Sequence, residues 1–256
     1  MRFVRNLAAA LSLYSRIPVP RFVWREDDLK YNLVFLPWVG AIVGAIVYAL
    51  TFLPGWGALP TLAKTAALAL VPLLATGGFH LDGFMDVQDA LRSYKPREEK
   101  LRILKDPHIG AFAVISAAVL ALFWLGALSV LVDRGDRAAL VPYAASFYEA
   151  RCAAALLAYT LKPAKKDGML ARETRTRDPK ILAALAFETA LGVLPLWRAP
   201  AALAASVLAF SWSAFRFKRL VYREFGGVTG DTAGYFIVWT ECAAAVLYAL
   251  LASLKL

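Results

Sequence analysis

The sequence predicts an all-α integral membrane protein, a polytopic bundle of about seven transmembrane helices with its amino terminus in the cytoplasm. Apolar residues make up 60% of the 256 residues, and the mean hydropathy is +0.56. Soluble domains contain roughly 45–50% apolar residues. The apolar residues form long runs, and the basic residues lie almost entirely between these runs. We therefore expect a single integral membrane domain over residues 1–256.

The first element expected is an amphipathic helix that lies at the membrane interface. Apolar residues recur there at helical spacing: Phe3, Leu7, Leu11 and Tyr14. This spacing gives a helix one apolar face, and two prolines soon after it disfavour its continuation. Residues 1–30 are thus predicted to be a cytoplasmic or interfacial segment.

Seven apolar runs follow, each close to the roughly 20 residues that a helix needs to cross the bilayer core. They cover residues 33–53, 61–78, 110–132, 138–161, 181–197, 200–217 and 232–254. The fifth and sixth runs are short, so they are also compatible with one helical hairpin or a re-entrant pair. We predict seven spans, plus or minus one.

The connections between runs differ in their content of Lys and Arg. With the amino terminus in the cytoplasm, the segments on that side carry 23 of the 29 basic residues, against four on the other side. Connections rich in Lys and Arg stay in the cytoplasm, which predicts cytoplasmic loops at 79–109, 162–180 and 216–231. Topology thus explains the formal net charge of +10. We expect the lipid bilayer as a partner and no nucleic acid.

A group of acids follows the second run. Asp82, Asp86 and Asp89 are spaced i, i+4 and i+7, which places them within roughly 60° of one another around a helix. Such carboxylates repel one another unless cations neutralise them, and Mg²⁺ or Mn²⁺ binds them together with substrate phosphates. A solvated acidic face is the alternative, but the apolar residues between the acids favour a metal or substrate site. His80, about 160° from Asp82, is either a catalytic ligand or donor, or a plain interfacial histidine.

Basic residues continue the same loop and suit a polyanionic substrate such as a diphosphate. The positive-inside rule alone explains most of them. Arg102 and the pair Lys105-Asp106 are the candidates for phosphate binding, because the pair lies where the chain re-enters the membrane. Arg151, inside the fourth run, is expected to contact a site carboxylate or substrate, or to form a structural ion pair.

A glycine-rich motif, Gly226-Gly-Val-Thr-Gly-Asp231, precedes the last run on the same predicted side. Gly227 and Gly230 would allow a phosphate to approach the backbone closely. Asp231 would bind metal or cap the helix that follows.

Four strings carry a family resemblance: Tyr14-Ser-Arg-Ile-Pro-Val-Pro20, Gly78-Phe-His-Leu-Asp-Gly-Phe-Met-Asp-Val-Gln-Asp-Ala90, Lys105-Asp-Pro-His-Ile-Gly110 and Gly226-Gly-Val-Thr-Gly-Asp231. In order and spacing they resemble the cobalamin synthases, also called adenosylcobinamide-GDP ribazoletransferases, over nearly the whole chain. The resemblance implies a Mg²⁺-dependent membrane enzyme of vitamin B12 nucleotide-loop assembly. Such an enzyme joins adenosylcobinamide-GDP to α-ribazole, or to α-ribazole 5′-phosphate, and releases GMP.

The family's functional residues carry over at matching positions only. Asp82, Asp86 and Asp89 match its acidic motif, Asp106 its Lys-Asp motif and Asp231 its Gly-Asp motif. The chain departs from the family at Ala90, where many members have glycine. It departs again at Pro107-His108, which replaces a small residue and an arginine, so the phosphate contact of that arginine is not carried over.

The residues by themselves also fit this reaction. A ribose hydroxyl would attack the phosphorus on the cobinamide side, and Asp86 or Asp89 would accept its proton. One alternative is a CDP-alcohol phosphotransferase, although its longer acidic pattern is not found here. Another is an ion-coupled transporter, which would hold its acids near mid-membrane. The sequence leaves open which acceptor is used and whether the chain forms a homo-oligomer.

Overall fold

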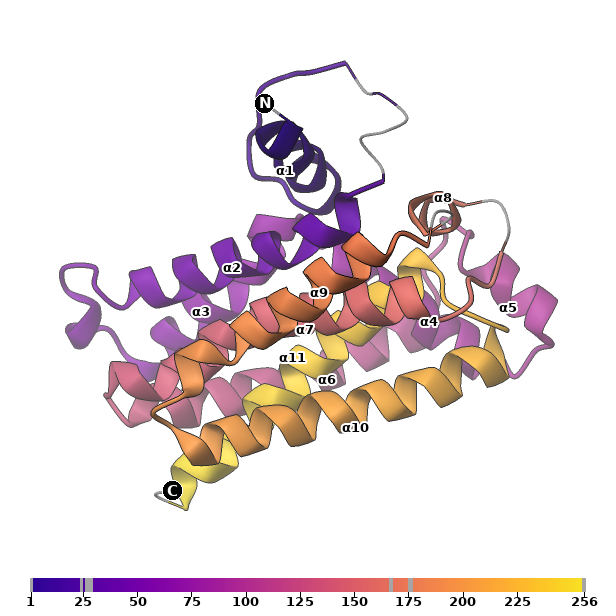
Figure 1. Cartoon of the computed structure of the whole chain (residues 1–256). Coiled ribbons are helices and arrows are strands. Elements are labelled where there is room, and N and C mark those ends of the chain that lie inside the picture. The colour runs from indigo at the N-terminus through magenta and orange to yellow at the C-terminus, as the bar shows by residue number, and fades with distance from the viewer. Residues whose placement is uncertain (1, 24, 26–29, 166–167, 175–176, 255–256) are drawn as a thin grey trace.

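Figure 1 shows the computed structural model of the chain, which describes all residues except 1, 24, 26–29, 166–167, 175–176 and 255–256. Lys166, Arg175 and Lys255 of the charge count above lie outside the described residues. The described residues form eleven α-helices: α1 (Arg2–Tyr14), α2 (Asn32–Leu50), α3 (Thr61–Thr76), α4 (Phe79–Arg92), α5 (Arg97–Ile103), α6 (Ala111–Asp133), α7 (Val141–Thr160), α8 (Met169–Glu173), α9 (Pro179–Gly192), α10 (Pro200–Glu224) and α11 (Gly230–Ser253). Three short 3-10 helices join them: η2 (Trp56–Ala58), η3 (Arg137–Leu140) and η4 (Leu194–Leu196).

The prediction of an all-α membrane bundle is confirmed. Five helical segments are long and apolar enough to cross a membrane: α2, α6, α9 extended to Leu196, α10 and α11. Helices α3 and α4 qualify only together, and because they meet at 90° they form a broken span or a re-entrant loop. The described residues thus give five or six candidate spans. All seven predicted runs are helical, and the exact number of crossings stays a prediction.

Helix α7 is the one predicted run that does not contribute to either count. It does not meet the same criterion because it contains Glu149, Arg151 and three tyrosines among its 20 residues. It is nevertheless central, since α2, α9, α10 and α11 all pack against it. Its two charged residues, Glu149 and Arg151, are buried by its neighbours, which is the expected place for charged groups within a membrane bundle.

Two glycines allow α2 to approach α7 closely. A Cβ atom added at Gly40 would lie 2.1 Å from the carbonyl oxygen of Phe147, and one at Gly44 would lie 2.2 Å from that of Ala144. The glycines are four residues apart and therefore share one face of α2. Small residues at this spacing are common where membrane helices pack backbone to backbone.

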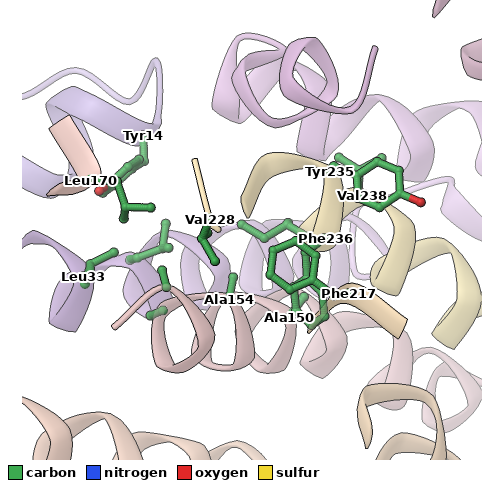
Figure 2. Packing of buried hydrophobic residues seen from close by; sticks show 14 of the residues in the cluster. Tyr14, Leu33, Ala150, Ala154, Leu170, Phe217, Val228, Tyr235, Phe236 and Val238 are labelled. Atoms are coloured by element: carbon green, nitrogen blue, oxygen red, sulfur yellow. The ribbon is translucent and has the colours of Figure 1, made fainter. Parts of the chain in front are cut away.

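The larger apolar core joins residues that are far apart in the sequence. Figure 2 shows Leu33 of α2, Ala154 of α7 and Phe217 of α10 in this cluster, with Phe236 of α11 against Phe217. The rings of Phe217 and Phe236 have centroids 5.1 Å apart. Within a membrane, contacts of this kind stabilise the bundle through van der Waals packing between helices.

The predicted amphipathic helix is α1, which lies on one side of the bundle (Figure 1). Phe3 packs edge-to-face on Phe35 of α2 at 5.0 Å between centroids. At the other end of α1, the Tyr14 hydroxyl donates a 2.8 Å hydrogen bond to Glu173 Oε1 in α8. The amino-terminal segment is therefore held against the bundle at both ends of its helix.

All three predicted loops contain regular structure, and the loop at 162–180 contains α8. Residues 79–109 form α4 and α5 rather than an extended loop, and the turn before α4 uses Gly77 and Gly78, which have φ angles of 64° and 79°. Residues 216–224 continue α10, so the predicted loop at 216–231 shrinks to 225–229. Helices α5 and α8 and the start of α11 all lie at one end of the bundle, opposite the carboxyl terminus (Figure 1). We call it the α5 end.

Candidate functional site

Three carboxylates meet where α4 crosses the beginning of α11. Gly83 makes the crossing close, because an added Cβ would lie 2.8 Å from the Asp231 carbonyl oxygen. Asp82 and Asp86 flank Gly83 on α4, and both interact electrostatically with neighbouring acids of this group. We call Asp82, Asp86 and Asp231 the acidic cluster. The structure thus joins two motifs that are about 150 residues apart in the sequence.

The acidic cluster brings like charges together, with Lys165 as a nearby base that acts on Asp231. The carboxylates of Asp82, Asp231 and Asp89 all act electrostatically on Asp86. Each of these neighbours disfavours the ionised form of Asp86. A bound cation would remove this repulsion.

Asp89, the third acid of the predicted set, has a different role in the structure. Its Oδ2 accepts a 2.6 Å hydrogen bond from the Gly110 amide, and its Oδ1 accepts one of 2.7 Å from the Ala113 amide. These amides belong to the start of α6, where N–H groups have no partner within the helix. Asp89 therefore caps α6 from a distant helix, which is a structural role, and its metal-binding or catalytic role stays a prediction.

A lysine that sequence reasoning did not single out lies beside the acidic cluster. Lys165 Nζ donates a 3.0 Å hydrogen bond to the Leu101 carbonyl oxygen. Partial burial and then the nearby positive charge of Lys105 lower the pKa of Lys165, whereas Asp231 opposes this shift. We call Lys105 and Lys165 the lysine pair. In the sequence, Lys165 is one of seven bases in the 162–180 loop, and only its tertiary contacts distinguish it.

The glycine-rich motif positions Lys165. A Cβ at Gly227 would lie 2.4 Å from the Lys162 carbonyl oxygen, so only glycine lets the strand-like segments approach. The Val228 amide donates to that oxygen at 2.9 Å, and the Ala164 amide donates to the Val228 carbonyl oxygen at 2.9 Å. The close backbone approach predicted at Gly227 therefore serves the chain itself, in place of a phosphate.

Gly230 fits its predicted role better. It is exposed at the first position of α11, and no atom of another residue lies within 4 Å of an added Cβ. Thr229 caps the helix by accepting a 3.1 Å bond from the Thr232 amide, and Thr232 completes a capping box. The first turn of α11 therefore starts in open space next to Asp231, where a phosphate could approach it.

Two other candidates near the loop do not join the acids. Asp106 is exposed and accepts bonds from its own turn, 3.0 Å from the His108 amide and 2.7 Å from His108 Nδ1. The hydrogen bond from the His108 backbone is the main reason why the pKa of Asp106 is lowered. Arg102 is also exposed, and its charge acts on Glu99 of its own helix.

His80 and Arg151 lie in the interior and do not reach the acidic cluster. Both line a cavity of about 330 Å³ between α3, α6 and α11. Arg151 forms a buried ion pair with Glu241 at 2.6 Å and donates to the Phe147 carbonyl oxygen at 2.8 Å. His80 is 4% exposed, and its Nε2 has no hydrogen-bond partner. Arg151 was predicted to contact a site carboxylate or substrate, or to form a structural ion pair, and the structure shows an ion pair with Glu241. The catalytic role predicted for His80 is not supported by its position.

The carboxylates of the acidic cluster fit a Mg²⁺ ion whose other ligands come from the substrate. Among the described residues, no group of three or more His, Cys, Asp or Glu has the geometry of a metal site. Mg²⁺ is usually bound by one or two carboxylates together with substrate phosphates. Two acids of the cluster therefore suffice, provided that a diphosphate supplies the other oxygens.

The fold and the site together define a polytopic helical membrane protein that presents facing carboxylates and lysines at one end of its bundle. More specifically, the chain belongs to the cobalamin-5-phosphate synthase family, whose model matches residues 6–249. The resemblance noted in the sequence is thereby confirmed.

Similar proteins cover nearly the whole chain. A protein of Lachnoclostridium phytofermentans, named adenosylcobinamide-GDP ribazoletransferase, is 35% identical over 247 residues, which are 95% of this chain and 93% of the relative. Proteins of the same name from Clostridium perfringens and Pseudomonas aeruginosa are 30% and 31% identical, over 97% and 96% of this chain and 99% and 98% of their own lengths. No solved structure matches the chain.

Proposed function

We propose that the chain is a membrane-bound transferase that joins adenosylcobinamide-GDP to α-ribazole, or to α-ribazole 5′-phosphate, and releases GMP. The proposal is supported by family membership and by the name of the relatives. The structural observation that carries it is the close crossing of α4 and α11 at Gly83, which brings the α4 acids into electrostatic interaction with Asp231 and places Lys165 near Asp231 and Lys105. Acids that can hold a metal and lysines that can neutralise phosphate are the two components that diphosphate chemistry requires.

Mg²⁺, or Mn²⁺, would be held by Asp82 and Asp231, which lie on the two helices that cross at Gly83. When bound, the ion supplies charge stabilisation to the diphosphate and to the departing phosphate. Lys165 and Lys105 would contact phosphate oxygens of the substrate and neutralise their charge. The exposed first turn of α11 at Gly230 would donate backbone hydrogen bonds to the same group.

Asp86 is the residue we assign to proton transfer, because its carboxylate interacts electrostatically with both of the other acids of the cluster. The ribose hydroxyl oxygen of the acceptor forms a bond to the phosphorus attached to cobinamide. The bond from that phosphorus to the bridging oxygen breaks, and GMP leaves with the electron pair. The hydroxyl proton passes to a carboxylate oxygen of Asp86. The step consumes the phosphoanhydride bond of the diphosphate and forms a phosphodiester with the acceptor hydroxyl, so no oxidant or further reactant is needed.

The test is GMP release by the purified chain with adenosylcobinamide-GDP and either acceptor, in the presence of Mg²⁺. We expect turnover that is lost on chelation and restored by Mg²⁺ or Mn²⁺. Asp82→Asn and Asp231→Asn should raise the Mg²⁺ concentration needed for half-maximal rate, because each removes one charged ligand. Consumption of CDP-diacylglycerol instead would indicate a CDP-alcohol phosphotransferase, and ion-coupled uptake into vesicles without GMP would indicate a transporter.

We further propose that the protein lies in the cytoplasmic membrane with the α5 end facing the cytoplasm. The excess of Lys and Arg in the segments at this end supports the orientation. Tyr94, which is 88% exposed between α4 and α5, offers a labelling position. A Tyr94→Cys variant should react with an impermeant thiol reagent only after cells are opened. A Leu53→Cys variant, at the opposite end, should react in intact cells, and the reverse pattern would refute the orientation.

A further inference from the structure

A second large cavity lies on the membrane-facing side of the bundle. It has a volume of about 660 Å³ and runs between α6 and α10, which both pack on α11. Phe123 of α6 and Leu208 and Trp212 of α10 line it and are all more than half exposed. Since α6, α10 and α11 all qualify as membrane spans, a groove with exposed apolar walls here opens sideways to lipid. We call this cavity the lateral groove.

The lateral groove is separate from the acidic cluster. Helix α4 closes one end of it through Phe84, Gln88 and Arg92. Phe84 is two residues from both Asp82 and Asp86, which is about 200° around a helix. Phe84 and the acids therefore lie on opposite faces of α4, and Arg92 is more than two turns further along the helix than Asp82. The groove thus needs an occupant other than the reacting diphosphate.

Two arginines form a positively charged rim at the α4 end of the groove. Arg92 lines the groove, and its guanidinium lies 5.8 Å from the ring centroid of Phe112. The guanidinium of Arg216 lies 5.3 Å from the ring centroid of Trp239, which is also a groove residue. Both arginines are exposed, and neither forms an ion pair with an acid among the described residues. By contrast, Arg223 on the same helix as Arg216 pairs with Glu224.

The dimensions of the groove fit one leaflet of a bilayer. Its walls extend from Ile115 to Phe123 on α6 and from Trp239 to Leu247 on α11. Eight residues of helix rise about 12 Å, and half of a hydrocarbon core is about 15 Å thick. A groove of this length that spans one leaflet would have its arginine rim at the depth of the lipid headgroups and its apolar part at the depth of the acyl chains.

We propose that the lateral groove binds an anionic phospholipid. Its phosphate contacts Arg92 and Arg216, and one acyl chain lies along Trp239 between α6 and α10. The charge of the rim selects an anionic headgroup over a zwitterionic one, since a zwitterion adds a positive charge beside the arginines. This lipid site is independent of the function proposed above.

The test is lipid binding to the purified full chain in neutral detergent, measured by quenching of tryptophan fluorescence. The probes are phosphatidylglycerol and phosphatidylcholine with brominated acyl chains, which quench Trp212 and Trp239 when they occupy the groove. We expect tighter binding of phosphatidylglycerol. A basic residue near anionic lipid contributes about fivefold in affinity, so a variant with both Arg92→Gln and Arg216→Gln should bind phosphatidylglycerol about thirtyfold more weakly.

The matched control removes two other exposed positive charges from the same region. A variant with Lys95→Gln and Lys218→Gln has the same net charge as the arginine variant, but neither lysine lines the groove. It should keep the selectivity for phosphatidylglycerol. Equal binding of both lipids by the unchanged protein, or equal loss in the two charge variants, would overturn the proposal.

A third variant tests the apolar part of the site. Ala243 lies on the groove floor, and Ala243→Phe should block the acyl chain and weaken quenching by both lipids while the arginines stay in place. If this variant keeps lipid binding but changes the oligomeric state, the occupant is a second copy of the chain and the lipid site is refuted. If it fails to fold, the two charge variants decide by themselves.

Discussion

Asparagine substitutions at Asp86 and Asp89 separate a chemical role from a structural one. In Asp89→Asn, the side chain keeps one carboxamide oxygen, whereas the carboxylate accepts from two amides at the start of α6. At least one bond to a charged acceptor is lost, which costs about 1.5–3 kcal/mol, and the favourable charge at the helix terminus, about 0.3–1 kcal/mol, is lost as well. We expect the free energy of unfolding to fall by about 2–4 kcal/mol.

Asp86→Asn should give the opposite pattern. The substitution removes one of the mutually repelling acids, so stability should stay the same or increase. The proton acceptor is lost, and general base catalysis contributes about 10²–10⁴ in rate. GMP formation in a single turnover should therefore slow by at least about 100-fold, and added Mg²⁺ should not restore it.

Both quantities can be measured on the same samples in detergent. Unfolding is followed by tryptophan fluorescence, and the chemical step by single-turnover GMP release with saturating Mg²⁺ and substrates. Glu98→Gln, which removes an exposed acid of α5, controls for the change in net charge. A stable but inactive Asp89→Asn protein, or an active Asp86→Asn protein, would refute the assignment of the two roles.

Three further predictions follow from the site and its supports. Lys165→Gln should lower kcat/KM about 10- to 100-fold, because a charged contact to phosphate worth about 1.5–3 kcal/mol is lost. As the control, Lys162→Gln removes an exposed lysine of the same loop and should change kcat/KM by less than about twofold. Gly83→Ala places a methyl group 2.8 Å from the Asp231 carbonyl oxygen. It should displace the acids and thereby lower kcat by about 100-fold. An unchanged kcat would contradict the close crossing of α4 and α11. Burial raises the pKa of Glu173 from 4.5 to about 7, so the folded state holds this proton more tightly than the unfolded state. Stability should therefore fall as pH rises from about 4.5 to about 7, by about 3 kcal/mol, and Glu173→Gln should abolish this dependence in unfolding measured across that range.

Much of the fold could be predicted because the signals are local. Long apolar runs predict helices of membrane length whatever their neighbours are, and all seven predicted runs are helical. The end of α10 was harder to predict because its last residues include four bases, which resemble a loop. Phe217 and Val221, four residues apart and both buried, show that the helix continues. The apolar spacing within this charged stretch was the available signal.

The spacing of residues in the sequence predicts on which face of a helix each side chain lies, and the candidate site could be predicted only to that extent. Spacing correctly put Asp82 and Asp86 on one face and His80 on another, and the shared side of the membrane correctly brought Asp231 toward them. Spacing could not distinguish Asp89 from the other two acids, because its role depends on which neighbour it faces.

For Asp89, that neighbour is the start of α6, whose two amides bind its carboxylate. The same limit explains why Lys165 was missed, since its distinction depends on the backbone bridge between Pro163 and Val228. This bridge in turn requires Gly227, which leaves no room for a side chain there. Gly227 was predicted to contact phosphate, but in the structure it positions Lys165, the lysine that we assign to phosphate binding. Substitution of Gly227 should therefore impair phosphate binding as Lys165→Gln does, although Gly227 itself contacts only the chain.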